Sequence, residues 1–175
     1  DDGFKVLELP YGSKDEQRFS MHIFLPNKRT GLATLEKKLF QSDESFADKF
    51  GKIANGAQWA KVVLTLPRFK IESKWDMSDL CKELGMNVAF TDRADFSLMT
   101  QNKMQLTIGQ IVQKAFVEVN EEGTVAAAAT ANFVISATSV PPPPIYFTAD
   151  HPFIVTISSI SDRTILFIAK LANLE

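Results

Sequence analysis

The length, composition and charge of this chain are those of a compact globular protein with one core. Of its 175 residues, 45% are hydrophobic and 23% are charged. Nineteen Lys and Arg residues against twenty-one Asp and Glu residues leave a net charge of −2, which excludes a broad electrostatic attraction to nucleic acid or to an anionic membrane surface. We therefore expect neither nucleic acid nor a membrane as a partner.

The first fifty residues predict two strands and two helices. Segment 4–11, FKVLELPY, alternates between polar and apolar side chains, and segment 19–26, FSMHIFLP, is apolar except for His22. The second segment therefore predicts a strand that is buried on both faces. Two short helices follow, with Ser42 or Asp43 as the expected N-cap of the second. Their apolar residues recur at helical spacing: Leu32, Leu35, Leu39, Phe46 and Phe50.

The middle of the chain changes to a period of two. From Lys61 onward the alternation predicts one strand that is bent or bulged at Pro67. DMSDLCKELGM then predicts a helix with Ser78 as N-cap and Gly85 as the stop. Segment 104–120 is expected to be one extended strand that spans about 50 Å.

Three further strands are predicted near the end of the chain, because 145–147, 152–159 and 164–172 are rich in β-branched and aromatic residues and are separated by turn signals. Together with the earlier elements they predict an α+β fold dominated by antiparallel strands.

Sites for catalysis or for a metal are not indicated. His22 and His151 lie far apart in the sequence, and neither belongs to a nucleophile motif. We therefore expect a protein that is not an enzyme, with no metal and no cofactor. His22 is expected to be a hydrogen-bonded core histidine, and Cys81 a small core residue rather than a reactive thiol.

The compartment stays open on the sequence alone. A single cysteine excludes an internal disulfide, which fits either an extracellular or a cytoplasmic protein. The absence of any Asn-x-Ser/Thr site favours the cytoplasm.

Segment 121–144, EEGTVAAAATANFVISATSVPPPP, is unusually poor in charged residues after Glu122. No charged side chain occurs between Glu122 and Asp150. If 124–133 formed a strand, neither of its faces would carry a charge, so it would enter a sheet without burying an ion. Three alternatives remain: a short helix capped by Thr124, a flexible tether, and a polyproline ligand formed by Pro141–Pro144.

Several motifs follow one another along the chain: VLELPY, MHIFLPN, LPRFKIESKWDMSDLCKELGM, KAFVEVNEEGTVAAAAT, FTADHPFIVTI and TILFIAKL. Together, and in this order, they resemble the serpins, a family of protease inhibitors. The resemblance implies that residues 1–172 are the C-terminal portion of a single serpin domain. The reactive-centre loop then lies at about 121–146, and 173–175 form a tail that includes a possible cloning scar.

The resemblance also implies a mechanism for the complete protein. A target protease cleaves the exposed loop, and the loop enters the large A sheet as a new strand before the acyl-enzyme is hydrolysed. The implied reactive bond joins Ala137 and Thr138, and the small residue at Ala137 suggests an elastase-like serine protease as partner. The implied hinge is Glu122, Gly123, Thr124, Val125, Ala126, Ala127, Ala128, Ala129 and Thr130, and the remaining bait residues are Ile135, Ser136 and Ser139.

Three departures from the family pattern accompany these motifs. Val125 stands in place of a glutamate, Gln113 in place of a histidine, and Ala169–Lys170 in place of Gly-Arg. None of them puts a charge or a proline into the hinge. A serpin-fold binding or carrier protein that does not insert its loop remains the alternative function, and an inactive fragment is the third. We expect the chain on its own to self-associate, because it lacks most of the A sheet.

Overall fold

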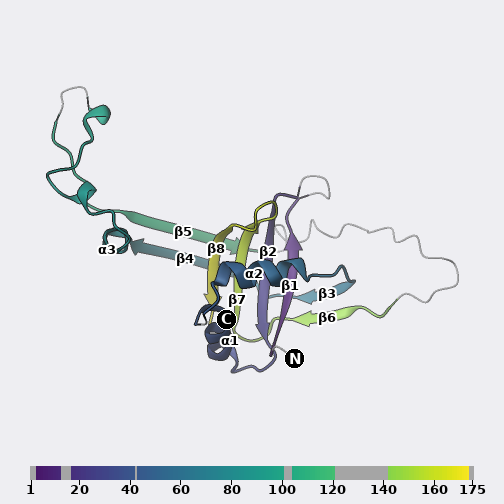
Figure 1. The fold of residues 1–175 in the computed structure, drawn as a ribbon. Coiled ribbons are helices and arrows are strands. Elements are labelled where there is room, and N and C mark those ends of the chain that lie inside the picture. The colour runs from purple at the N-terminus through teal and green to yellow at the C-terminus, as the bar shows by residue number, and fades with distance from the viewer. Residues whose placement is uncertain (1–2, 13–16, 42, 101–103, 121–141, 174–175) are drawn as a thin grey trace. The chain divides into compact units, whose positions relative to one another are not determined.

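The computed structural model describes residues 3–12, 17–41, 43–100, 104–120 and 142–173 (Figure 1). They form two compact units, one built from the described residues up to Phe69 and from Val119 onward, the other from Lys70–Glu118. The elements in chain order are β1 Phe4–Pro10, β2 Phe19–Pro26, α1 Leu32–Phe40, α2 Phe46–Asn55, β3 Val62–Thr65, β4 Phe69–Asp76, α3 Ser78–Glu83, the 3-10 turns Val88–Phe90 and Ser97–Met99, β5 Val112–Val119, β6 Ile145–Thr148, β7 Phe153–Ser159 and β8 Ile165–Leu171.

A four-stranded antiparallel sheet is the centre of the first unit. Its strand order is β1-β2-β7-β8. The two central strands are almost wholly buried, and β2 has seven buried residues in succession after Phe19. The prediction of a strand buried on both faces is therefore confirmed.

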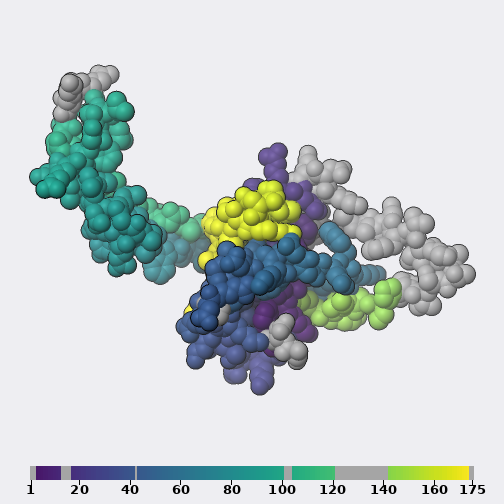
Figure 2. Space-filling view, viewed as in Figure 1, coloured from purple at the N-terminus to yellow at the C-terminus, as the bar shows by residue number. Residues whose placement is uncertain are grey.

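Two amphipathic helices cover one face of this sheet. Figure 1 shows α2 crossing in front of the strands, and in Figure 2 the two blue helices hide much of the sheet while β8 stays visible. Their apolar stripes pack on the strands because each turn returns an apolar side chain to the same side. The core cluster is Phe24, Leu35, Leu39, Phe50, Ala54 and Ile154.

The N-cap of α2 differs from the prediction. Ser45 caps the helix, since its Oγ accepts a hydrogen bond from the Asp48 backbone N–H at 3.2 Å. Asp43 lies too early in the chain for this role, and Ser42 falls outside the described residues. An acidic side chain at Asp48 in the first turn also suits the positive end of the helix.

Segment 61–76 forms two strands rather than one bent strand. β3 pairs in parallel with β6, whereas β4 pairs with β5 in a separate two-stranded sheet. Pro67 lies in the connection, where its missing N–H and fixed backbone angle end the first pairing.

The second unit contains most of β4, α3 and most of β5. The predicted long strand is wrong for residues 104–111. Their polar groups bond to other segments: the Gln105 side chain donates to the Asp92 carbonyl at 2.6 Å, and the Ile108 N–H donates to the Ala89 carbonyl at 2.9 Å. Only 112–119 remain available for strand pairing.

The prediction for helix α3 is right at its C-terminal end and wrong at its N-terminal end. Gly85 does stop it, with φ of +101°, a conformation that glycine adopts without strain. Ser78, however, is the first helical residue, and the Asp76 carboxylate accepts its backbone N–H at 2.9 Å. The Ser78 Oγ instead accepts the Ile111 N–H at 2.9 Å. Within the described part of the chain no helix has the length and apolar character of a membrane span.

Candidate functional site

All residues of the predicted reactive loop that carry chemistry lie outside the described residues. These are the hinge 122–130, the bond between Ala137 and Thr138, and the bait residues Ile135, Ser136 and Ser139. In the sequence, the described strands that precede and follow this predicted loop are β5 and β6, and each is described by itself below.

Strand β5 precedes the predicted loop in the sequence. Among the described residues its only strand partner is β4, so one of its edges has no neighbouring strand there. Such an edge presents backbone N–H and C=O groups to any added strand. Val119, the last residue of β5, is buried and fixes the point from which the chain continues towards the loop.

Strand β6 includes the last residues of the predicted loop, Ile145 and Tyr146, which form part of this strand. It pairs in parallel with β3, with Val62 opposite Ile145 and Thr65 opposite Thr148. Two backbone bonds close the pairing at its ends: the Ile145 N–H donates to the Lys61 carbonyl at 2.8 Å, and the Ala149 N–H donates to the Thr65 carbonyl at 2.9 Å. The Phe147 side chain of β6 is buried, which anchors the strand in the first unit.

A polar cluster follows β6 directly. The Asp150 carboxylate contacts the His151 Nδ1 at 2.8 Å and accepts a hydrogen bond from the Arg29 Nη1 at 2.6 Å. The other ring nitrogen of His151 lies 2.7 Å from the Pro26 carbonyl oxygen at the end of β2. The hydrogen bond with His151 is the largest cause that lowers the pKa of Asp150 below its usual value, and the hydrogen bond from Arg29 is the second.

Sequence reasoning did not find this cluster. The adjacency of Asp150 and His151 was a usable signal, since neighbouring side chains in a turn often bond to each other. Arg29 gave none, because 121 positions separate it from Asp150.

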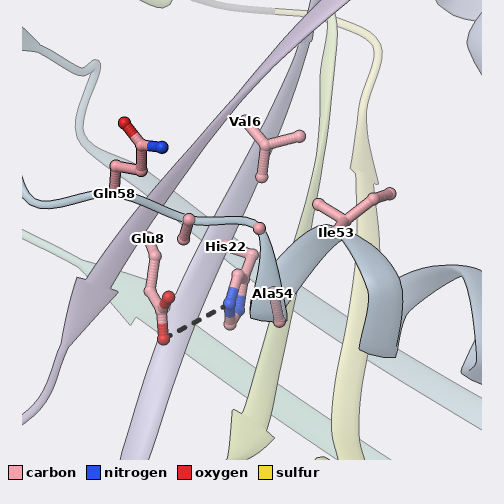
Figure 3. A pocket seen from close by; sticks show the side chains of 8 residues that line it. Val6, Glu8, His22, Ile53, Ala54 and Gln58 are labelled. Carbon is pink, nitrogen blue, oxygen red and sulfur yellow. Dashed lines mark ion pairs between the residues drawn. The ribbon is translucent and has the colours of Figure 1, made fainter.

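A second polar group lines a cavity of about 370 Å³ between β1, β2 and the end of α2. Figure 3 shows Glu8 and His22 turned towards each other, with Ile53 and Ala54 on the neighbouring helix α2. The His22 Nε2 lies 3.5 Å from the Glu8 Oε1, which is long for a hydrogen bond. Contact with His22 nevertheless lowers the pKa of Glu8, against the raising effect of burial.

The structure corrects the prediction that His22 is a satisfied core histidine. The side chain is only 1% exposed, packs edge-on against Phe50 at 4.7 Å between ring centroids, and has no hydrogen-bond partner on either ring nitrogen. Buried hydroxyls on the neighbouring strand positions share this condition: Ser20, Thr156 and Ser158. Glu8 lies opposite His22 in the sheet, with its Oε1 at 3.5 Å from the His22 Nε2.

Cys81 has a more exposed position than the sequence predicted, and Gln113, the departure from the family's histidine, lies at the surface. Cys81 is a free thiol of intermediate burial on α3 rather than a core residue, and Gln113 is exposed on β5. Within the described ranges no group of three or more His, Cys, Asp or Glu side chains is arranged to hold a metal ion.

Comparison with known proteins identifies the family of these strands. A family model described as "Serpin (serine protease inhibitor)" matches residues 1–174. Serpin-Z2A of Triticum aestivum is 39% identical over 175 residues, which cover 98% of this chain and 43% of that protein.

Solved structures agree with the sequence match. Serpin48 of the insect Tenebrio molitor, whose structure is described as that of a highly specific serpin, matches with a TM-score of 0.67 and 36% identity, over 99% of this chain and 42% of its own. A complex of thyroxine-binding globulin with thyroxine matches with a TM-score of 0.69, over 99% of this chain and 42% of its own, but at 23% identity it shows the fold alone. The chain thus spans less than half the length of the relatives it matches.

Proposed function

This chain belongs to the serpin family and forms the C-terminal part of the serpin fold, and we propose that the complete protein inhibits a protease as a suicide substrate. One observation carries the proposal. The uncharged segment that follows Glu122 begins shortly after the end of β5 at Val119, and β5 has a strand partner on one edge only among the described residues. A cleaved loop that folds back beside β5 would pair with that edge and leave no ion buried.

The energetics favour insertion only when several terms act together. About a dozen new residues would each gain about 0.5–1.5 kcal/mol net from ladder hydrogen bonds. Ordering each residue costs about 1–2 kcal/mol, so apolar burial and the relief of strain in the uninserted sheet must supply the rest. A charge among hinge residues 124–130 would add several kcal/mol of desolvation and would prevent insertion.

The target class follows from the bait residues. We place the reactive bond between Ala137 and Thr138, so a protease with a shallow primary pocket, such as an elastase-like serine protease, is the proposed partner. Larger or charged residues at the position before the cut would be required for trypsin-like enzymes.

The test is incubation of the complete protein with elastase-like and trypsin-like proteases, with denaturing gels to detect covalent complexes. We expect a stable complex with the first class and cleavage between Ala137 and Thr138. Ala128→Asp should turn the inhibitor into a substrate that is cut without trapping, whereas the matched Ala128→Ser variant should still trap. Equal trapping by the wild type and Ala128→Asp, or a stable complex only with trypsin-like enzymes, would contradict the proposal.

A carrier function is the second candidate, favoured by the cavity beside Glu8 and His22 with its unpartnered ring nitrogens. Thermal unfolding of the complete protein before and after loop cleavage separates the two functions. An inhibitor should melt at a much higher temperature once its loop is cut, while a carrier that does not insert the loop should show an unchanged melting temperature.

We also infer that the isolated chain self-associates. Many of its large apolar side chains are exposed in the second unit, and monomeric soluble proteins rarely expose large apolar patches to water. The residues concerned are Leu84, Met86, Val88, Leu98, Met99 and Met104.

A further inference from the structure

We propose that Arg29, Asp150 and a doubly protonated His151 form a pH-sensitive clasp that holds β6, and with it the C-terminal anchor of the reactive loop, to the end of β2. The clasp itself is built only from described residues. Its importance for inhibition rests on the proposed function, but its existence does not.

The protonation state follows from the two partners of the ring. The Nδ1 lies 2.8 Å from the Asp150 carboxylate and the Nε2 lies 2.7 Å from the Pro26 carbonyl oxygen. Both partners are acceptors, and a neutral imidazole has a proton on only one nitrogen. A neutral ring would therefore point a lone pair at an oxygen on one side, while a ring with both protons donates on both sides.

Arg29 fixes the carboxylate from the opposite side. Its Nη1 donates to the Asp150 Oδ2 at 2.6 Å and its Nη2 donates to the Asp150 backbone carbonyl at 2.9 Å. One guanidinium thus binds both the side chain and the main chain of the residue between β6 and β7.

The turn that presents Arg29 is itself tightly constrained. The Gly31 N–H donates to the Lys28 carbonyl at 2.8 Å. A Cβ at Gly31 would lie 2.8 Å from the Pro26 Cβ and 2.9 Å from the Lys28 oxygen, so only glycine fits this close approach. The Pro26 carbonyl and Arg29 are therefore held in fixed relation on either side of Asp150 and His151.

The surroundings identify which other groups face the ring. Lys5 of β1 and Tyr146 of β6 line the same surface hollow as His151, and no acidic side chain other than Asp150 is among its lining residues or ring partners. Only 10% of the His151 side chain is exposed, against 51% of Asp150. A ring that loses its second proton there has little access to water as a replacement partner.

The pH dependence has a definite sign. The clasp needs a proton on both ring nitrogens, so removal of one proton in alkaline solution takes away one of the two hydrogen bonds and weakens the hold on β6. The lowered pKa of Asp150 keeps the carboxylate ionised down to pH values below 3.8, so the clasp is complete in weakly acidic solution.

Hydrogen–deuterium exchange of the free complete protein tests the clasp without any protease. The amides of Ile145 and Ala149 are the probes, since their bonds to Lys61 and Thr65 close the pairing of β6 with β3. After correction for intrinsic exchange, protection of the peptide 145–151 should fall about tenfold between pH 5.5 and pH 8.5, the loss expected for one charge-assisted hydrogen bond.

Variants of His151 make the test specific. His151→Gln should show the low protection at both pH values, and His151→Arg, which can donate to both acceptors at either pH, should show the high protection at both. If His151→Arg does not fold, Asp150→Asn replaces it and should lose most of the pH dependence. Glu36→Gln is the control, because it removes the ion pair between Lys170 and Glu36, which does not involve β6.

The outcomes separate the clasp from the inhibitory function. Protection that is independent of pH in the wild type, or a His151→Gln variant that behaves as the wild type does, would overturn the clasp. Failure to trap any protease would overturn the proposed function while leaving the exchange result intact.

Discussion

The two units of the chain bury their apolar side chains to very different extents. The first unit contains the large, fully buried side chains of the core, among them Phe24, Phe50 and Phe153. Among the described residues 70–100 and 104–118, only Ser78 and Ala94 are buried. The first unit therefore gains its stability from apolar contacts that lie within this chain.

The second unit is ordered mainly by hydrogen bonds at the corner between β4, α3 and β5. Asp76 accepts from Ser78 and from the Gln110 side chain, and Ser78 accepts from Ile111. Its apolar side chains, such as Trp75 at 64% exposure and Leu84 at 80%, have little contact with the rest of the described chain. This contrast teaches that one unit is ordered by its own core, whereas the other leaves most of its large apolar side chains exposed.

The largest expected effect is the loss of a core ring from the first unit. Phe50→Ala removes a ring that packs against Phe24, Phe46 and His22, and should cost about 3–5 kcal/mol of the free energy of unfolding. Urea unfolding followed by circular dichroism measures the change. The matched truncation in the second unit, Leu84→Ala, should change the free energy by only about 0.5 kcal/mol or less. Equal losses for the two variants would show that the contrast in burial does not govern stability.

Self-association should depend on the second unit. Sedimentation velocity of the 175-residue chain is expected to show oligomers that grow with concentration. A double variant, Leu84→Ser with Leu98→Ser, removes two side chains that are 80% and 102% exposed and should shift the chain towards monomer, because each buried Leu in a contact contributes about 1.5–3 kcal/mol. Phe40→Ser, at an exposed position of the first unit, is the control. A wild-type chain that remains monomeric at all concentrations would contradict this expectation.

The elements of the first unit were largely predictable because their signals are local. The apolar run of β2 indicates within a few residues that this strand is buried. The helical spacing of Leu35, Leu39 and Phe50 likewise indicates which faces of α1 and α2 are buried. The N-cap was missed because three candidates, Ser42, Asp43 and Ser45, stand within four positions, and only the bond to the Asp48 N–H distinguishes them.

Features set by distant partners were not predictable. The alternation through Pro67 is the same in β3 and β4, and only their different partners, β6 and β5, make them separate strands. The sequence pattern of residues 104–111 is typical of a strand. In the structure, however, the Gln105 side chain bonds to the carbonyls of Asp92 and Ala94, and the segment is not a strand. The motifs identified the family, but the positions of the hinge and the reactive bond remain predictions, because both fall outside the described residues.

The smallest expected effect concerns acid, and it tests whether hydrogen bonds hold the corner of the second unit. Three hydrogen bonds lower the pKa of the Asp76 carboxyl from 3.8 to about 2. In order of their effect, they come from the Ser78 hydroxyl, the Gln110 side chain and the Ser78 N–H. A lowered pKa means that the ionised carboxylate contributes stability above pH 3.8, and that this contribution is lost as the pH falls towards 2.

Trp75 is the natural probe because it adjoins Asp76 and is exposed. In a Trp59→Phe background, its fluorescence should change between pH 3.8 and about 2 as the corner loosens. Asp76→Asn keeps the shape but removes the charge, so its corner should already resemble the acid form at neutral pH and should lack the transition. The effect is modest because solvent screens an exposed carboxylate. An Asp76→Asn variant that retains the same acid transition would assign the change to another group, and the corner would then depend on contacts other than this carboxylate.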